Sequence, residues 1–311
     1  MNEQRLKSLL QQIRSREITV QAALEEIKHP SYDDLGFAKV DTHRHLRQTI
    51  PENPATPFQS AVRFKEIGGT RNSMAAMKDL GTYGVIKAPA GYILEAIKKG
   101  PFDLESFGYA MEALILSATR IGLGTCWLGG TFTKSVFARK MEVTPDETVP
   151  AVMAFGEIAD KRRMTEKIIR WGARASKRKQ WQSLFFDRSF GTHLDEKRAG
   201  AYRIPLEMVR IGPSGSNKQP WRIVRDFPYF HFYLQRTKGY YERNKRYFGM
   251  ADMQRIDMGI AMCHFEHTCR ALALNGEWIM EDPRIDGLPD LTTYVASYRA
   301  MEENAVSSVA I

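Results

Sequence analysis

The sequence predicts an α+β protein built from two similar halves behind a short helical leader. Short apolar segments that resemble strands are interspersed with long amphipathic segments that resemble helices, which favours α+β over a doubly wound sheet. Two of the long segments match each other, and residues 49–57 hold three prolines that mark a linker or domain entry. We therefore expect a leader over 1–48, a first half over 49–188 and a second half over 189–311.

The leader is predicted to be helical because its leucines are spaced for one helix face. Leu6, Leu9 and Leu10 recur at that spacing. Thr19 can cap a second short helix, which His29-Pro30 ends, because the residue before a proline disfavours helical geometry.

The two halves are predicted from an internal repeat. Phe107–Trp127 and Met258–Trp278 align when Gly108 is paired with Gly259. We expect each copy to be a long helix, ended by Gly124 or by Asn275-Gly276, that leads to a strand at its tryptophan. The identical positions are Ala110/Ala261, Met111/Met262, Leu123/Leu274 and Trp127/Trp278. A shared helix end and a tryptophan in the same register indicate a tandem duplication rather than chance.

Short apolar runs supply the remaining strands. Residues 151–156 (AVMAFG) are apolar and brief, which is typical of a buried strand. Residues 222–224 and 231–234 flank a turn that contains proline, so they predict a hairpin.

Composition excludes several classes of protein. Hydrophobic residues make up 43% and charged residues 26%, as in ordinary globular chains. No apolar run is long enough to span a bilayer, the N-terminus does not resemble a signal peptide, and three cysteines predict a thiol-reduced, cytoplasmic protein. Ten of the basic residues, against two acidic ones, fall between Lys161 and Arg188. This stretch is either a solvated surface or a site for a phosphate-bearing ligand; nucleic acid is disfavoured, since no recognition motif accompanies it.

Three motifs fail on inspection. Gly122-Leu-Gly124 starts like a dinucleotide fingerprint, but Trp127 occupies the position of the third glycine. Residues 212–218 approach a P-loop, yet Asn217 replaces its second glycine. Cys263 and His267 share a helix face beside His264 and Cys269, but the first copy lacks this cluster. We predict core thiols and surface histidines there, and no metal.

Residues 210–221 (RIGPSGSNKQPW) form the most informative motif. The segment predicts a turn rich in amide and hydroxyl groups that could meet the polar edge of a flat heterocycle, with Trp221 as an anchor. An ordinary Ser/Gly/Asn loop would not require Gln219-Pro220-Trp221 directly before a strand.

The segment PSGSNKQPW resembles the Ser-x-x-Asn-x-Gln-Pro-Trp motif of the FMN-dependent nitroreductase family. GLGTCWLGGTF (122–132) is similar to the family segment that borders the flavin ring, and Gly156 with Lys161-Arg162 resembles its last strand and phosphate contacts. The likeness is closest to a tandem subgroup with two halves in one chain, and it covers roughly 57–298.

The resemblance implies a nitroreductase-like fold in which the halves form an internal pseudo-dimer with one FMN site. The first half would supply Leu128, Gly129, Gly130, Lys161 and Arg162, and the second half Ser214, Ser216, Asn217, Lys218 and Gln219. Lys218 would stabilise negative charge on the reduced ring, or would be merely solvated. Only one site is complete, because Asn275-Gly276-Glu277 replaces the glycine-rich turn in the second copy.

The chain departs from the family pattern at its start. The family's Arg-x-Ser-x-Arg stretch, which grips the FMN phosphate, does not precede Pro57. Instead residues 1–48 resemble the N-terminal segment of the nucleotide carboxylase that helps to make the lactate racemase nickel cofactor, without its catalytic domain. Arg44 and Arg47 are the basic residues that could substitute.

The resemblance implies an FMN-dependent, NADH- or NADPH-linked oxidoreductase that reduces nitro, quinone or similar electron-poor acceptors. Two alternatives are a non-catalytic flavin- or nucleotide-binding protein with a degenerate phosphate site, and a nucleotide-binding protein of cofactor maturation, suggested by the leader alone. The partners expected are a small-molecule acceptor and the two halves themselves. We expect no membrane partner, and the sequence leaves further association of chains open.

Overall fold

The computed structural model describes residues 56–58, 60–68, 86, 89–130, 132–157 and 177–301. The chain divides into two units, Met1–His45 and Leu46–Ile311, and every described residue belongs to the second. The expected leader helices, Lys161 and Arg162 lie outside the described residues.

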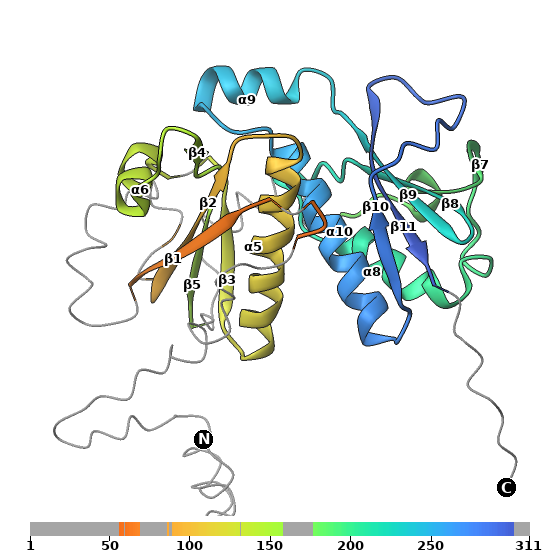
Figure 1. The fold of residues 1–311 in the computed structure, drawn as a ribbon, viewed down its shortest axis with the longest axis horizontal. Coiled ribbons are helices and arrows are strands. Elements are labelled where there is room, and N and C mark those ends of the chain that lie inside the picture. Colours follow the sequence, from red (N-terminus) through yellow and green to blue (C-terminus); the bar gives the residue numbers. More distant parts are fainter. Residues whose placement is uncertain are drawn as a thin grey trace, which may run out of the picture. The chain divides into compact units, whose positions relative to one another are not determined.

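The described part of the chain has two mainly antiparallel sheets with two long helices between them (Figure 1). The first sheet has the order β1-β2-β5-β3, and β4 also pairs with β2. Its strands are β1 (Val62–Gly68), β2 (Gly91–Lys98), β3 (Gly124–Leu128), β4 (Glu147–Thr148) and β5 (Val152–Gly156). Strand β2 is buried on both faces: Ile93 and Ile97 face α5, whereas Tyr92, Leu94 and Ala96 face α6.

The second sheet has the order β10-β11-β9-β8-β6-β7. Its strands are β6 (Phe185–Asp187), β7 (Ser189–His193), β8 (Trp221–Asp226), β9 (Tyr229–Gln235), β10 (Gly276–Ile279) and β11 (Thr292–Ala300). Only the pair β6–β8 is parallel.

Two long helices lie side by side between the sheets (Figure 1). Helix α5 (Asp103–Arg120) packs on the first sheet and α10 (Met253–Ala271) on the second. The other described helices are α6 (Lys134–Met141), α8 (Arg203–Ile211), α9 (Tyr240–Phe248) and the 3₁₀ turns η2 (Trp181–Ser183), η3 (Gly200–Tyr202) and η4 (Gly215–Asn217). None of the helices in the described ranges is long and apolar enough to cross a membrane.

The central strands of the two sheets follow the same order. Strands β8, β9, β11 and β10 of the second sheet correspond to β1, β2, β5 and β3 of the first. With this correspondence both sheets have the same order of neighbouring strands, β1-β2-β5-β3 and β8-β9-β11-β10. In both cases a hairpin-like pair precedes the long helix and the other two strands follow it. The extra strands β6 and β7 extend only the second sheet.

The helices α5 and α10 cross at two glycines. A methyl group on Gly108 would overlap the carbonyl oxygen of Ile256, and one on Gly259 would overlap that of Glu105. These contacts are reciprocal, because Ile256 and Gly259 follow Glu105 and Gly108 by the same number of residues. Glycine is needed at both positions for the two backbones to approach so closely.

The mixed helix and strand content is as the sequence predicts. The run 151–156 forms β5, residues 222–224 and 231–234 lie in the antiparallel hairpin β8–β9, and both long helices lead to strands that contain Trp127 and Trp278. The predicted helix ends are wrong: Gly124 and Gly276 begin strands. The left-handed residues that follow the helices are Gly122 (φ 81°) and Ala273 (φ 57°) instead.

In the Cys/His cluster of α10, His264 and His267 contact Glu112 and Tyr109 of α5. Cys263 and Cys269 are fully buried, and burial raises the pKa of the Cys263 thiol. His264 is not a surface residue as predicted, since its Nε2 lies 2.9 Å from Oε1 of buried Glu112, whose Oε2 accepts from Trp127 Nε1. Among the described residues, no group of three or more His, Cys, Asp or Glu could hold a metal ion.

Candidate functional site

The segment 214–219 is a tight turn directly before β8. Ser214 starts it: its carbonyl accepts from the Asn217 amide (2.9 Å) and its Oγ accepts from the Gln219 amide (3.0 Å). Trp221, the first residue of β8, is fully buried and anchors the end of the turn in the core.

The amide side chains of this turn bond within the protein. Gln219 is buried; its Oε1 accepts from the Lys179 amide (2.8 Å), and its Nε2 donates to Oδ1 of Asn217 (3.0 Å). Asn217 also donates to the carbonyl of Lys177 (2.6 Å) and accepts from Nη1 of Arg178 (3.0 Å). The turn is therefore braced by residues 177–179, which lie next to it in space.

Three residues of the turn have left-handed backbone conformations. Their φ angles are 49° for Ser216, 54° for Asn217 and 46° for Gln219. Such conformations are uncommon outside glycine and cluster at binding and catalytic sites, where surrounding bonds hold them.

Cationic side chains converge on the same turn. Lys179 Nζ (3.3 Å) and Arg222 Nη1 (3.1 Å) both donate to the Gln219 carbonyl, and Lys218 Nζ lies 5.4 Å from the centre of the Tyr240 ring. Within the described ranges no carboxylate pairs with these three side chains. Burial, together with Arg222 and Lys218, lowers the pKa of Lys179 to about 8, and burial lowers that of Arg222 to about 10. The arrangement can attract an anion.

The segment Leu128–Gly130 ends β3 on the other side of the candidate site. Leu128 is buried, and the two glycines are covered by methionines. A methyl group would lie 2.6 Å from Met253 Cε if placed on Gly129, and 2.7 Å from Met250 Sδ if placed on Gly130. Because neither glycine has a side chain, the two methionines can lie directly against the backbone at this end of β3.

Met253 brings the two predicted parts of the site together. Its side chain covers Gly129, while its Cβ would lie 3.1 Å from a methyl group on Gly215. Tyr240 closes the same corner, since its hydroxyl donates to Oγ of Ser216 (3.0 Å). The residues predicted in the first half (Leu128–Gly130) and in the second half (Ser214–Gln219) thus border one region, although they are far apart in the sequence.

Lys179 belongs to the basic stretch in which the sequence predicts a phosphate site or a solvated surface. Sequence reasoning missed the other residues at this place: Lys134, Arg222, Tyr240, Met250, Met253 and Asp257. Lys134 follows the glycines, its Nζ donates to the Gly249 carbonyl (2.6 Å), and burial lowers its pKa. These residues carry no sequence signal because they reach the site through tertiary contacts.

One signal was available in the sequence. The spacing Arg-x-Ser-x-Arg, sought before Pro57, occurs instead at Arg174-Ala-Ser-Lys-Arg178, ahead of the second half. Arg178 is the described member, and it contacts Asn217 of the turn.

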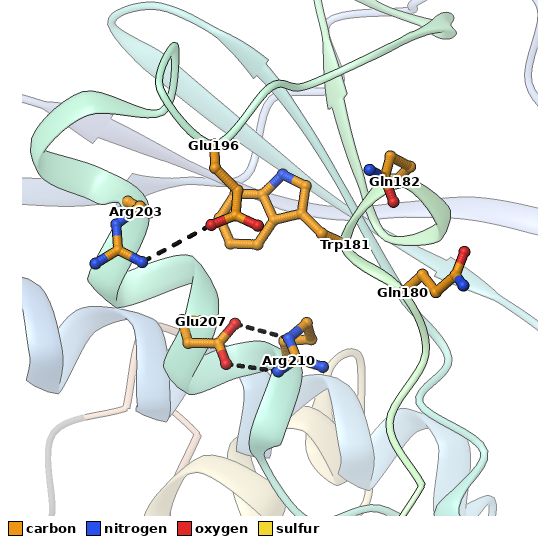
Figure 2. Close-up of a pocket in the computed structure, with 7 residues that line it drawn as sticks. All are labelled: Gln180, Trp181, Gln182, Glu196, Arg203, Glu207 and Arg210. Atoms are coloured by element: carbon orange, nitrogen blue, oxygen red, sulfur yellow. Dashed lines mark hydrogen bonds and ion pairs between the residues drawn. The ribbon is translucent and has the colours of Figure 1, made fainter.

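A polar groove of about 600 Å³ lies beside the turn, between η2 and α8 (Figure 2). Glu207 and Arg210, both on α8, pair at 2.6 Å along its wall, and Arg203 lies 3.8 Å from Glu196. The remaining lining residues are Gln180, Trp181 and Gln182. Arg210 lines this groove and also donates to the Lys179 carbonyl (3.3 Å). It therefore links the groove to residues 177–179, which brace the turn.

A model of one protein family matches the sequence. The family model described as "Putative TM nitroreductase" matches residues 67–269, more than half of the chain. The chain belongs to this family, and membership indicates a nitroreductase-like oxidoreductase.

Solved structures of related description match the chain at low identity. A "putative nitroreductase" from Thermotoga maritima MSB8 is 18% identical, with 85% of this chain and 87% of that chain covered and a TM-score of 0.48. Another from Anabaena variabilis ATCC 29413 is 10% identical, with 68% and 69% covered and a TM-score of 0.44. At these scores the matches carry no argument, so family membership rests on the family model. No curated protein matches the chain.

Proposed function

We propose that this chain is an FMN-dependent oxidoreductase that uses NADH or NADPH to reduce nitro, quinone or similar electron-poor acceptors. The observation that supports it most directly is the convergence of Leu128–Gly130 and Ser214–Gln219 on Met253. These are the segments that the family resemblance assigns to opposite sides of one flavin.

The residues present fit FMN. A flat heterocycle needs polar contacts along one edge and close backbone approach along another, which the turn and the glycines offer. A phosphate and a reduced, negatively charged ring need cations, and Lys179, Lys218 and Arg222 lie at the turn, with Arg178 beside Asn217.

Each group then has a defined task. Ser214, Ser216, Asn217 and Gln219 keep the turn in its strained shape, and Lys218 offers a positive charge to the ring. The Leu128–Gly130 backbone borders the ring, and Met250 with Met253 excludes water from that side. When bound, FMN supplies the redox chemistry, taking hydride from a nicotinamide and delivering electrons to the acceptor.

We also propose that the two halves form an internal pseudo-dimer with a single site. The matching strand orders of the two sheets and the reciprocal contacts of Gly108 and Gly259 support this arrangement. Isologous contacts of this kind are typical of two-fold interfaces.

Two sets of basic residues are candidates for binding the FMN phosphate. One is Lys161 with Arg162, and the other is Arg178, which lies within the Arg-x-Ser-x-Arg spacing. FMN carries the phosphate and riboflavin does not, so the grip is identified by the variant that weakens FMN more than riboflavin. We expect Arg178→Ala or Lys161→Ala/Arg162→Ala to do so in titrations of apoprotein. Equal losses for both ligands in both variants would contradict a phosphate role.

One observation favours the non-catalytic alternative: the amides of Asn217 and Gln219 already bond within the protein. Oxidation of NADH or NADPH with a quinone or nitroaromatic acceptor separates the two functions. FMN binding with turnover supports the oxidoreductase, whereas FMN binding without any nicotinamide oxidation supports a flavin-binding protein.

A further inference from the structure

A buried carboxyl group lies against the turn of the candidate flavin site. Asp257 belongs to α10 and is 1% exposed. Its Oδ1 accepts from the backbone amide of Gly215 at 2.8 Å. The side chain therefore ties the long central helix to the turn, next to Met253 and Tyr240.

The second oxygen of the same carboxyl is unsatisfied. Asp257 Oδ2 is buried and has no hydrogen-bond partner among the described residues. Nearly all buried polar atoms in folded proteins have a partner, because an unpartnered one carries the full cost of its desolvation. An orphan oxygen at the edge of a candidate ligand site points to a group that the ligand brings.

The surroundings of Asp257 favour its neutral form. Burial raises the pKa of Asp257 well above its ordinary value, Asp252 acts in the same direction, and the Gly215 amide opposes them. The charged and titratable neighbours are Asp252, which pairs with Arg236, and Tyr240, over whose ring Lys218 lies. A neutral carboxyl has a hydrogen atom to donate from the oxygen that lacks a partner.

We propose that Asp257 is a ligand-binding and positioning residue of this site: Oδ1 holds Gly215 and so fixes the turn, while Oδ2–H donates a hydrogen bond to a carbonyl-type acceptor on the bound heterocycle. The inference rests on the proposed function, because that acceptor belongs to the flavin.

Two substitutions separate the two roles. Asp257→Asn keeps an oxygen for Gly215 and a permanent donor in place of Oδ2–H, whereas Asp257→Ala removes both. FMN is titrated into each apoprotein by flavin fluorescence at about pH 6, where Lys179 keeps its charge. The Asn variant should bind within about threefold of wild type, because it keeps both the acceptor for Gly215 and a donor toward the ligand. The Ala variant should bind about tenfold or more weakly.

Ser106→Ala is the matched control, because Ser106 occupies the corresponding position of α5 and bonds to Ser60 away from the turn. It should leave FMN affinity unchanged. If the Ala variant does not fold, the affinity of the Asn variant still decides. Unchanged affinity in the Ala variant, or an Asn variant that binds FMN about tenfold or more weakly than wild type, would overturn the role of Asp257. A wild-type protein that binds no FMN would overturn the proposed function itself.

Discussion

Asn217 shows how much one residue of the turn contributes. Its side chain joins Arg178, Gln219 and the Lys177 carbonyl, and its backbone is left-handed. Asparagine tolerates this conformation better than most residues. The residue therefore stabilises the turn in two separable ways, through its amide group and through its φ angle.

Substitution of Asn217 and Ser214 should weaken FMN without unfolding the protein. We expect Asn217→Ala and Ser214→Ala each to cost about 0.5 to 1.5 kcal/mol of FMN binding, since each removes hydrogen bonds that shape the turn. Asn217→Gly is the companion variant, because glycine keeps the φ angle without the side chain. Isothermal titration with FMN measures all three. Wild-type affinity in both alanine variants would remove the turn from the site.

Lys179 should make the ligand-free protein more stable as the pH rises. Its folded-state pKa of about 8 lies below the ordinary value of 10.5, so between these values the unfolded chain holds more protons than the folded one. The free energy of unfolding therefore increases with pH across that window. Below about pH 8 Lys179 is charged in both the folded and the unfolded chain, so its burial lowers the free energy of unfolding by an amount that does not change with pH. Lys179→Met should flatten the increase. Urea unfolding of both proteins at several pH values tests this, and identical slopes would count against a buried, charged Lys179.

At the residue scale the sequence revealed the turn but not its surroundings. Gln219-Pro220-Trp221 before a strand was readable as a special turn because the motif is contiguous. Lys179, Met253 and Asp257 meet it only after folding, from positions tens of residues away. No local pattern marks an aspartate whose only described bond is to the amide of Gly215.

At the scale of elements, the α5–α10 crossing is the feature that orders the rest. It brings together both sheets through one helix pair, and buried carboxylates reinforce it: Glu112 bonds to His264, and Glu266 accepts from Tyr109 at 2.6 Å. Arg255 of α10 also pairs with Glu105 of α5 at 2.6 Å.

Alanine at either crossing glycine should destabilise the protein. In a helix interior Gly→Ala is ordinarily stabilising, but here the new methyl group meets a backbone carbonyl of the other helix. We expect Gly108→Ala and Gly259→Ala each to lower the free energy of unfolding by about 1 to 3 kcal/mol. Gly100→Ala is the control, since nothing lies within 4 Å of its added methyl group. A thermal melt in which all three behave alike would contradict the close crossing.

Elements with a strong period were predictable, and short or irregular ones were not. Both long helices, β5 and the β8–β9 hairpin follow from apolar spacing. The short strands β6 and β7 and helix α9 did not, because β7 is largely exposed and α9 is mostly polar outside Tyr240. The end of α10 was misplaced because a residue other than glycine, Ala273, takes the left-handed position, and the end of α5 because Gly122 rather than Gly124 takes it.

At the scale of the whole molecule, the duplicated strand order supports one site shared by two halves. The sequence predicted two halves from a single matching helix segment, and the sheets show the same order around each helix. The boundary near residue 48 and the role of the leader stay predictions.

Removal of the leader should separate folding from cofactor binding. We expect a chain that begins near Thr49 to remain helical and to bind FMN less tightly, if Arg44 and Arg47 assist at the phosphate. Circular dichroism and FMN titration measure the two properties. Loss of folding would show that the leader helices belong to the core, and unchanged affinity and thermal stability would show a loosely attached remnant.

The absorbance spectrum of the purified protein, with FMN added to saturation and the excess removed, tests the central claim most directly. The account predicts flavin bands that correspond to about one FMN for each chain, because we propose one complete site formed by both halves. A protein that stays colourless after reconstitution with FMN would contradict a flavin site between Leu128–Gly130 and Ser214–Gln219, and two FMN for each chain would contradict the single site.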